Sequence, residues 1–176
     1  IPILALLTAP EKSHCRAIIL APTRELAKQT FQQCNLLGNH RKFKIKLLTK
    51  ATAAATADQQ SSCDLLITTP LRLVGAINGK EMDLSKVSIL VVDEADRLFE
   101  EGFVEQIDEI FAACTAPQLQ RALFSATLPP VVEELALTVL RDPVRVTIGG
   151  RNGATETVKQ KLLFVGNEEG KLLAMR

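Results

Sequence analysis

The sequence predicts a doubly wound α/β domain, in which helices cover both faces of a parallel β-sheet. One observation is a set of short runs that are apolar at every position, as strands buried on both faces are. These runs are residues 17–21, 65–67, 89–92 and 122–124. The other observation is that amphipathic stretches with apolar residues at helical spacing separate the runs. Alternating strands and helices of this kind build α/β folds.

The elements of the N-terminal half are expected in a simple order. The strand 17–21 leads into an amphipathic helix over about 24–37. Residues 43–47 alternate between apolar residues and lysine, which indicates a strand with one face toward water. The apolar strands 65–67 and 89–92 follow.

The C-terminal half continues the alternation. A helix is expected over about 102–114, because apolar residues repeat at helical spacing and acidic residues occupy the other face. The strand 122–124 follows, and Pro129-Pro130 begins another helix. Residues 144–148 alternate as a further candidate strand.

The glycine-rich stretch 149–153 is the best candidate for a linker. Beyond it, a strand over 161–165 and a helix over 168–176 indicate the start of a second domain. Since the chain lacks an initiator methionine, we expect it to be part of a longer protein.

Composition excludes several classes of protein. The 176 residues are 47% hydrophobic and 23% charged, which excludes a disordered chain. The net charge of +1 means that nucleic-acid binding must rest on local groups, and the absence of Trp and Tyr argues against a base-stacking platform. The four cysteines have no C-x-x-C spacing, so a zinc site is not expected and reduced thiols are. The apolar run 1–9 is too short to span a membrane, so no membrane association is expected.

Small polar motifs follow four of the apolar strands. They are Pro22-Thr23-Arg24-Glu25, Thr69-Pro70-Leu71-Arg72, Asp93-Glu94-Ala95-Asp96 and Ser125-Ala126-Thr127. Ligands of open α/β sheets bind outside the carboxyl ends of the strands. Ordinary polar turns would explain one or two such motifs, but four point to a shared site at that edge.

Two of these motifs predict helix starts that suit phosphate groups. Thr69 and Pro70 have the residue types of an N-cap and a first helical residue, and Arg72 adds charge in the first turn. Thr23 and Arg24 repeat this arrangement. Such starts could contact an extended phosphate backbone; ordinary capping is the alternative.

Asp93 and Glu94 directly follow a strand of four apolar residues, which is the Walker B pattern. A buried strand of this kind delivers a carboxylate to a magnesium ion on nucleotide phosphates, and the next acid can orient the attacking water. The alternative is an acidic first turn of a helix.

A phosphate cradle of the form G-x-x-x-x-G-K-[ST] is absent from the 176 residues. The segment 166–171 is one residue short and carries two acids, so we reject it. Either the protein is not a nucleotide hydrolase, or its cradle lies upstream of Ile1.

A basic cluster also stands out. Its members are Arg41, Lys42, Lys44, Lys46 and Lys50. We interpret it as the solvated face of an edge strand, with a side contact to RNA as the alternative.

Together, the motifs resemble the DEAD-box ATP-dependent RNA helicases. The chain has Asp93-Glu94-Ala95-Asp96 between Pro22-Thr23-Arg24-Glu25-Leu26 and Ser125-Ala126-Thr127, in the order of that family. Thr69-Pro70-Leu71-Arg72-Leu73 resembles the family's TPGRL motif. The segment 149–176 resembles the branch of the family that is needed for small-subunit ribosomal RNA maturation.

The resemblance implies two RecA-like domains. Residues 1–148 would belong to the first RecA-like domain, 149–160 to the linker, and 161–176 to the start of the second domain. The helix ending near Leu7 would follow the phosphate-binding loop, so this piece alone would be inactive as an ATPase.

The resemblance also implies the roles of the site residues. Asp93 would hold Mg²⁺ through water for bound ATP, and Glu94 would position the hydrolytic water. Asp96 would tie the acidic motif to its neighbours, while Ser125 and Thr127 would couple the state of ATP to domain closure. The residues along the RNA backbone would be Pro22, Thr23, Arg24, Thr69, Pro70 and Arg72.

Two departures from the family affect the RNA contacts. Leu71 stands where the family has glycine, so its side chain would crowd a phosphate close to the backbone. The family's Gly-Gly pair is missing, and Thr49-Lys50-Ala51-Thr52-Ala53 occupies that region.

The leading hypothesis is therefore an ATP-dependent RNA helicase that unwinds short duplexes, acting on pre-ribosomal RNA with a possible protein activator. The branch resemblance implies the nucleus or nucleolus, with the cytoplasm as the alternative. A catalytically silent RNA-binding scaffold is the second hypothesis. A DNA translocase, or a metal nuclease using Asp93, Glu94 and Asp96, is the third.

Overall fold

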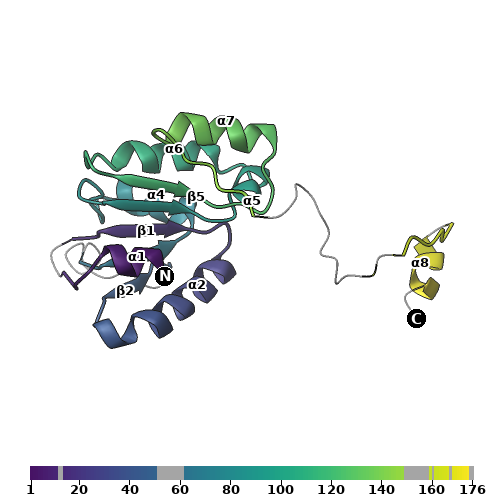
Figure 1. Cartoon of the computed structure of the whole chain (residues 1–176), viewed down its shortest axis with the longest axis horizontal. Coiled ribbons are helices and arrows are strands. Elements are labelled where there is room, and N and C mark those ends of the chain that lie inside the picture. Colours follow the sequence, from purple (N-terminus) through teal and green to yellow (C-terminus); the bar gives the residue numbers. More distant parts are fainter. Residues whose placement is uncertain (12–13, 51–61, 149–158, 160, 167, 175–176) are drawn as a thin grey trace. The chain divides into compact units, whose positions relative to one another are not determined.

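The computed structural model describes residues 1–11, 14–50, 62–148, 159, 161–166 and 168–174. Two compact units divide the chain, Ile1–Val144 and Arg145–Arg176. The first unit contains a five-stranded sheet with the strand order β2-β3-β1-β4-β5, and every neighbouring pair is parallel (Figure 1). The strands are β1 (Ala17–Leu20), β2 (Ile45–Leu47), β3 (Leu65–Thr68), β4 (Ile89–Val92) and β5 (Gln120–Leu123).

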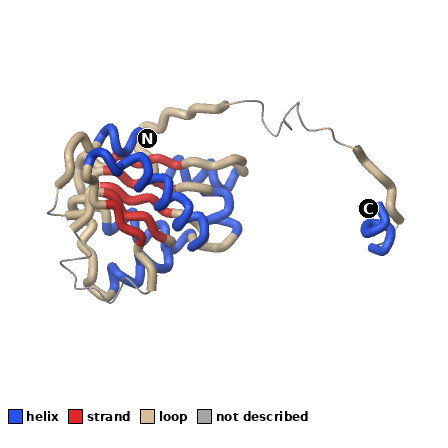
Figure 2. Tube along the Cα trace, turned by 90° about the horizontal axis from the view of Figure 1, so that it is seen from below, coloured by secondary structure: helices blue, strands red, loops and turns tan. Residues whose placement is uncertain are grey.

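Helices cover both faces of this sheet. The helices of the first unit are α1 (Pro2–Leu6), α2 (Arg24–Gly38), η1 (Asn39–Arg41, a 3-10 helix), α4 (Pro70–Asn78), α5 (Ala95–Glu100), α6 (Val104–Ala113) and α7 (Pro130–Val139). Figure 1 shows α6 and α7 on one side of the strands and α2 on the other, and Figure 2 shows the strands enclosed between helices. The second unit contains α8 (Glu168–Ala174).

Alternate residues of each central strand belong to different cores. Ile18 and Leu20 of β1 pack in the cluster that includes Leu73 of α4 and Ile107 of α6. Ile19 packs instead in the cluster formed with α1 and α2. β1, β3 and β4 are buried at every position. The prediction of a parallel sheet with helices on both faces is therefore confirmed.

Most predicted elements are confirmed, with bounds that differ by a few residues. The prediction of a strand over 144–148 is wrong. These residues form no strand, and the side chains of Val144, Val146 and Ile148 are 88%, 80% and 96% exposed. An alternating pattern makes a strand only when another strand supplies its hydrogen bonds, and none of the described residues does so here.

The predictions for the C-terminal part have mixed outcomes. The helix expected over 168–176 is confirmed as α8, but residues 161–165 form no strand among the described residues. All of the predicted linker 149–160 except residue 159 lies outside the described residues, as do residues 51–53 of the stretch that occupies the place of the family's Gly-Gly pair. That residues 161–176 begin a second RecA-like domain stays a prediction.

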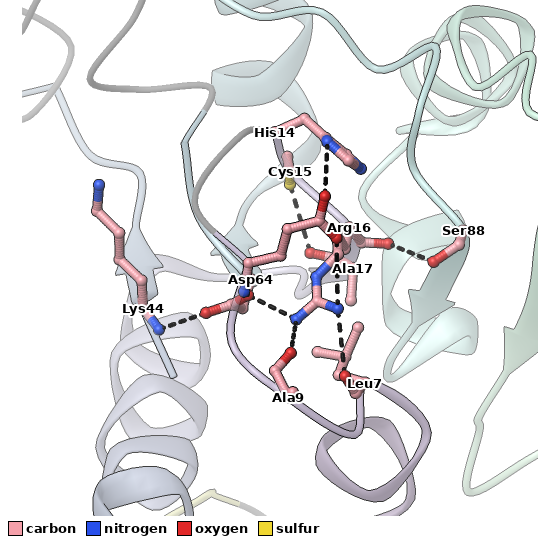
Figure 3. A network of polar contacts seen from close by, with 10 residues as sticks. Leu7, Ala9, His14, Cys15, Arg16, Ala17, Lys44, Asp64 and Ser88 are labelled. Atoms are coloured by element: carbon pink, nitrogen blue, oxygen red, sulfur yellow. Dashed lines mark hydrogen bonds and ion pairs between the residues drawn. The ribbon is translucent and has the colours of Figure 1, made fainter. Parts of the chain in front are cut away.

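A buried ion pair joins the amino ends of the strands (Figure 3). The Asp64 side chain, just before β3, is 1% exposed, and its Oδ1 lies 2.6 Å from Nη2 of Arg16, just before β1. The same carboxylate accepts hydrogen bonds from the backbone N–H groups of Glu11 (2.8 Å) and Lys44 (2.7 Å). Each oxygen of the buried carboxylate therefore has a partner, as a charge in this position requires.

Arg16 extends this network to the segment that follows α1. Its guanidinium donates to the carbonyl oxygens of Leu7 (3.2 Å) and Ala9 (2.6 Å). Its own carbonyl accepts the Ser88 hydroxyl at 3.1 Å, just before β4. This network thus connects the starts of β1, β2, β3 and β4 at the amino edge of the sheet.

Replacing Arg16 tests how much this network stabilises the fold. Arg16→Met leaves the Asp64 carboxylate buried without its cation, so we expect the free energy of unfolding to fall by about 3–5 kcal/mol. Arg41→Met, which changes an exposed arginine, is the control and is expected to shift it by less than about 0.5 kcal/mol. Urea unfolding measures both, and equal small effects would contradict the structural role of the pair.

Candidate functional site

All four predicted motifs begin at one row of the sheet. Leu20 of β1 pairs with Thr68 of β3 and Val92 of β4, and Val92 pairs with Leu123 of β5. Because these strands are parallel and end in the same row, the residues that follow them emerge at one edge. The structure therefore brings the four motifs to the same side of the domain.

The acidic motif makes a sharp turn after β4. The Asp93 N–H donates to the carbonyl of Leu20 (2.9 Å), which extends the pairing with β1 by one residue. Glu94 then takes a left-handed conformation with φ 52° and ψ 51°, and its N–H donates to Oδ1 of Asp93 at 3.1 Å. This conformation costs a non-glycine residue about 1–2 kcal/mol. Such strain is typical of functional sites.

The helix α5 begins directly after this turn. The Leu98 N–H donates to the Glu94 carbonyl at 3.1 Å. Neither α5 nor the left-handed turn is predicted from the sequence, because the apolar pattern indicates only the helix after Gly102. The side chains of Asp93 and Glu94 are left half-buried at the edge of the sheet.

Asp96 ties the end of β4 to the end of β5. Its carboxylate accepts a hydrogen bond from the Thr127 hydroxyl at 2.5 Å and one from the Thr127 N–H at 3.1 Å. The backbone N–H of Asp96 donates to Oγ of Ser125 at 3.1 Å. The residues Asp96, Ser125 and Thr127, which sequence analysis selected together, are thus in direct contact.

These contacts also set the ionisation of Asp96. The residue is only 8% exposed, and burial alone would raise the pKa of its carboxyl group. Hydrogen bonds from the Thr127 and Ser125 side chains and from backbone N–H groups outweigh burial and lower the pKa. Asp96 is therefore a carboxylate at neutral pH.

The three acids of the motif do not converge on one point. Across the residues that the structure describes, no three His, Cys, Asp or Glu side chains lie close enough to hold a metal ion. Asp96 is bonded to Thr127, whereas Asp93 has one oxygen bonded to the Glu94 N–H. A hard oxygen donor at a half-buried strand end suits Mg²⁺ that retains waters and bridges to phosphates. Asp93 fits that role, and the geometry gives no support to a metal nuclease built from all three acids.

A groove of about 270 Å³ lies beside the ends of β1 and β3. Four of the six residues predicted to contact RNA line it: Pro22, Arg24, Thr69 and Arg72. The other two have structural positions. Thr23 caps α2 by accepting the Leu26 N–H at 3.2 Å, and Pro70 is buried as the first residue of α4.

Charge in this groove has one sign. Arg24, Lys50 and Arg72 line it, and no Asp or Glu does so among the described residues. The Nε atom of Arg72 is buried and has no hydrogen-bond partner in the described part of the chain. Leu71 lines the groove with its side chain 59% exposed. The groove therefore suits an anion with an apolar side, such as a sugar-phosphate backbone.

Two lining residues were not assigned to this groove from the sequence. Phe103, in the predicted helix over 102–114, directly precedes α6, where it packs against the apolar core and also lines the groove. Lys50 was grouped with the basic cluster, yet it lies in the groove with Arg24 and Arg72. The sequence does contain a signal for this position of Lys50. Lys50 comes three residues after the end of the predicted strand 43–47, whereas Lys44 and Lys46 lie within that strand.

A larger hollow, of about 660 Å³, lies along α2. It is lined by Phe31, Leu36, Lys42 and their neighbours and contains none of the predicted site residues. The positions of the predicted site residues therefore favour the smaller groove as the functional site.

No helix among the described residues is long and apolar enough to cross a membrane.

Comparisons with known proteins agree with these motifs. The family model described as "DEAD/DEAH box helicase" matches residues 1–135. The chain is 50% identical over 175 residues to "DEAD-box ATP-dependent RNA helicase 57" of Oryza sativa subsp. japonica, covering 99% of this chain and 32% of that protein. It is 46% identical over 169 residues to "ATP-dependent RNA helicase ROK1" of Lodderomyces elongisporus, covering 94% of this chain and 31% of that protein. The chain thus spans about a third of the length of these relatives.

Solved structures give the same result for the fold. The yeast DEAD-box splicing factor Prp28 has a TM-score of 0.76 at 27% identity, over 99% of this chain and 43% of that one. A DEAD box protein from Methanococcus jannaschii has a TM-score of 0.69 at 29% identity, over 80% of this chain and 39% of that one. The predicted RecA-like α/β fold is confirmed.

The contact between Asp96 and Thr127 predicts a measurable change in pKa. Thr127→Val removes the hydroxyl donor, so the pKa of Asp96 should rise, whereas Thr127→Ser keeps the donor and should leave it low. Because the folded-state pKa is lowered, the contact stabilises the protein above the unfolded-state pKa of about 3.9, and that contribution is lost as pH falls through the folded-state value. At pH 7, Thr127→Val should cost about 1 kcal/mol of unfolding free energy.

Carbon-13 NMR titration of the Asp96 carboxyl group measures the change. The same pKa in Thr127→Val as in the unchanged protein would contradict the contact.

Proposed function

This chain belongs to the DEAD/DEAH box helicase family, and from this premise we propose that the whole protein is an ATP-dependent RNA helicase. It couples ATP binding and hydrolysis to RNA binding and to the local separation of short duplexes. One observation carries the proposal: the strained acidic turn after β4 and the cationic groove beside β1 and β3 emerge from the same row of one sheet. The relatives that match nearly the whole chain are named ATP-dependent RNA helicases.

The nucleotide side of this proposal rests on the acidic turn. Asp93 would hold Mg²⁺ through water, and the ion would neutralise charge on the phosphates of ATP. The left-handed conformation of Glu94 directs the chain out of β4 so that two consecutive acids stay at the edge of the sheet. We assign Glu94 to orienting the attacking water. The glycine-lysine cradle is not among these 176 residues, so residues outside them would complete the site.

The contact between the β4 and β5 ends supports a coupling role. Asp96 is bonded to both backbone and hydroxyl of Thr127, and its own N–H is bonded to Ser125. A shift of the acidic turn on nucleotide binding would therefore be passed to the loop 125–127. We propose that these three residues couple the state of ATP to domain closure.

The RNA side rests on the groove. Arg24 and Arg72 offer charge to phosphates, Pro22 and Thr69 shape the wall, and Thr23 and Pro70 hold the two helix starts in place. Contacts of this kind bind the backbone and do not read bases. We therefore propose binding that is independent of RNA sequence.

We also propose a cellular role in ribosome biogenesis, with pre-ribosomal RNA as substrate and the nucleolus as location. Support comes from the resemblance of residues 149–176 to the small-subunit branch and from relatives such as "Probable ATP-dependent RNA helicase ddx52" of Dictyostelium discoideum, 46% identical over 178 residues. A protein activator is part of the proposal, because a structural neighbour, yeast Dbp5, has been solved bound to Nup159 and Gle1.

Replacing Glu94 in the full-length protein tests the enzymatic proposal. Glu94→Gln keeps the shape of the side chain and removes its charge, so ATP and RNA binding should persist while turnover falls by about 10²-fold or more. Glu109→Gln, an exposed change on α6, is the control and should leave turnover unchanged. RNA-stimulated phosphate release measures both.

Unchanged turnover in Glu94→Gln would remove this residue from the chemistry. A full-length protein that binds RNA but releases no phosphate would instead favour the silent scaffold.

A further inference from the structure

Lys50 leaves the sheet in the same row as the four motifs. Leu47 of β2 pairs with Ile67, and the Leu48 N–H donates to the Ile67 carbonyl at 3.0 Å. This register places Leu48 beside Thr68, the last residue of β3. The residues after Leu48 therefore emerge at the carboxyl edge, as those after Thr68 do. β2 thus brings a fifth strand end, with its own lysine, to the site.

The position of Lys50 separates it from the rest of the basic cluster. Lys44 precedes β2 at the opposite edge, where its Nζ lies 3.0 Å from Oγ of Ser62. Lys46 is a half-buried residue within β2, and burial together with the neighbouring Lys44 lowers its pKa. Lys42 lines the hollow along α2. Among the described residues, Lys50 is the only member of the basic cluster that lines the groove.

The helix start beside the groove offers few backbone donors. Pro70, at the first position of α4, has no N–H, and the Arg72 N–H donates to the Thr69 carbonyl at 3.1 Å. Leu71, which lies between Pro70 and Arg72 in the chain, has a side chain that is 59% exposed at this helix start. A phosphate in the groove would therefore be held mainly by cationic side chains, and not by the helix N-terminus.

Three cations from three connections meet in this groove. Arg24 follows β1, Lys50 follows β2 and Arg72 follows β3, and no acidic residue lines the groove within the described part. No ion pair is formed by any of the three in that part of the chain. Like charges that share a groove repel one another unless an anion lies between them. A polyanion bound in the groove would relieve this repulsion.

We propose that Lys50 is an RNA-binding residue, which contacts a phosphate of a single-stranded RNA backbone in the groove that Arg24 and Arg72 also line. This proposal rests on the proposed helicase function and adds a contact to it. The apolar wall formed by Leu71 and Phe103 lies along the same groove and suits the sugar side of the strand.

Binding of a fluorescein-labelled 12-nucleotide oligouridine to the full-length protein tests the proposal by fluorescence anisotropy over a range of salt concentrations. Lys50→Ala should weaken binding about 3- to 10-fold near 0.1 M salt. It should also make the slope of log K against log salt less negative by about 0.7, the value for one phosphate contact on a single strand. Lys50→Arg keeps the charge and should retain both values.

Lys44→Ala is the matched control, because it removes the same charge from the other end of the same strand and should change neither affinity nor slope. Equal effects of Lys44→Ala and Lys50→Ala would overturn the assignment in favour of a diffuse basic surface. Loss of affinity in Arg72→Ala but not in Lys50→Ala would keep the proposed function and overturn the role of Lys50. Absence of binding by the unchanged protein would overturn the RNA function itself.

Discussion

Parallel pairing in one register is the constraint on which the site depends. Leu20, Thr68, Val92 and Leu123 lie in one row, so four chain segments leave the sheet at the same level. A slip of one residue in any strand would exchange its two faces and move its motif out of line. The alternation between two cores opposes such a slip, because Ile18 and Ile19 belong to opposite clusters. Packing of the sheet thus determines where the polar residues lie.

The two edges of the sheet have different chemistry. At the amino edge, Asp64 and Arg16 form an ion pair and also bond to the surrounding backbone, which stabilises the ends of the strands. At the carboxyl edge, cations line the groove and no acidic residue of the described ranges does so, and Glu94 is held in a strained conformation. In the proposed function, stability and binding therefore depend on opposite ends of the same strands.

The sequence predicted the parts of the fold that depend on local pattern. Apolar runs located β1, β3 and β4 because these strands are buried on both faces, and the acidic tetrapeptide located the acidic residues that follow β4. The failures come from tertiary context. Residues 144–148 have a strand pattern but no partner strand, α5 is too short to show helical periodicity, and Lys50 looks like part of a basic run until the register of β2 is known. The contact of Asp96 with Thr127 was expected only from the family resemblance.

The central claim is that RNA lies along the carboxyl edge of this sheet, and cross-linking tests it most directly. The full-length protein would be bound to a short RNA containing 4-thiouridine, irradiated, and its cross-linked peptides identified by mass spectrometry. The account predicts cross-links within residues 22–24, 47–50 and 69–72. Cross-links confined to the amino edge, at residues 14–16 or 41–46, would contradict it.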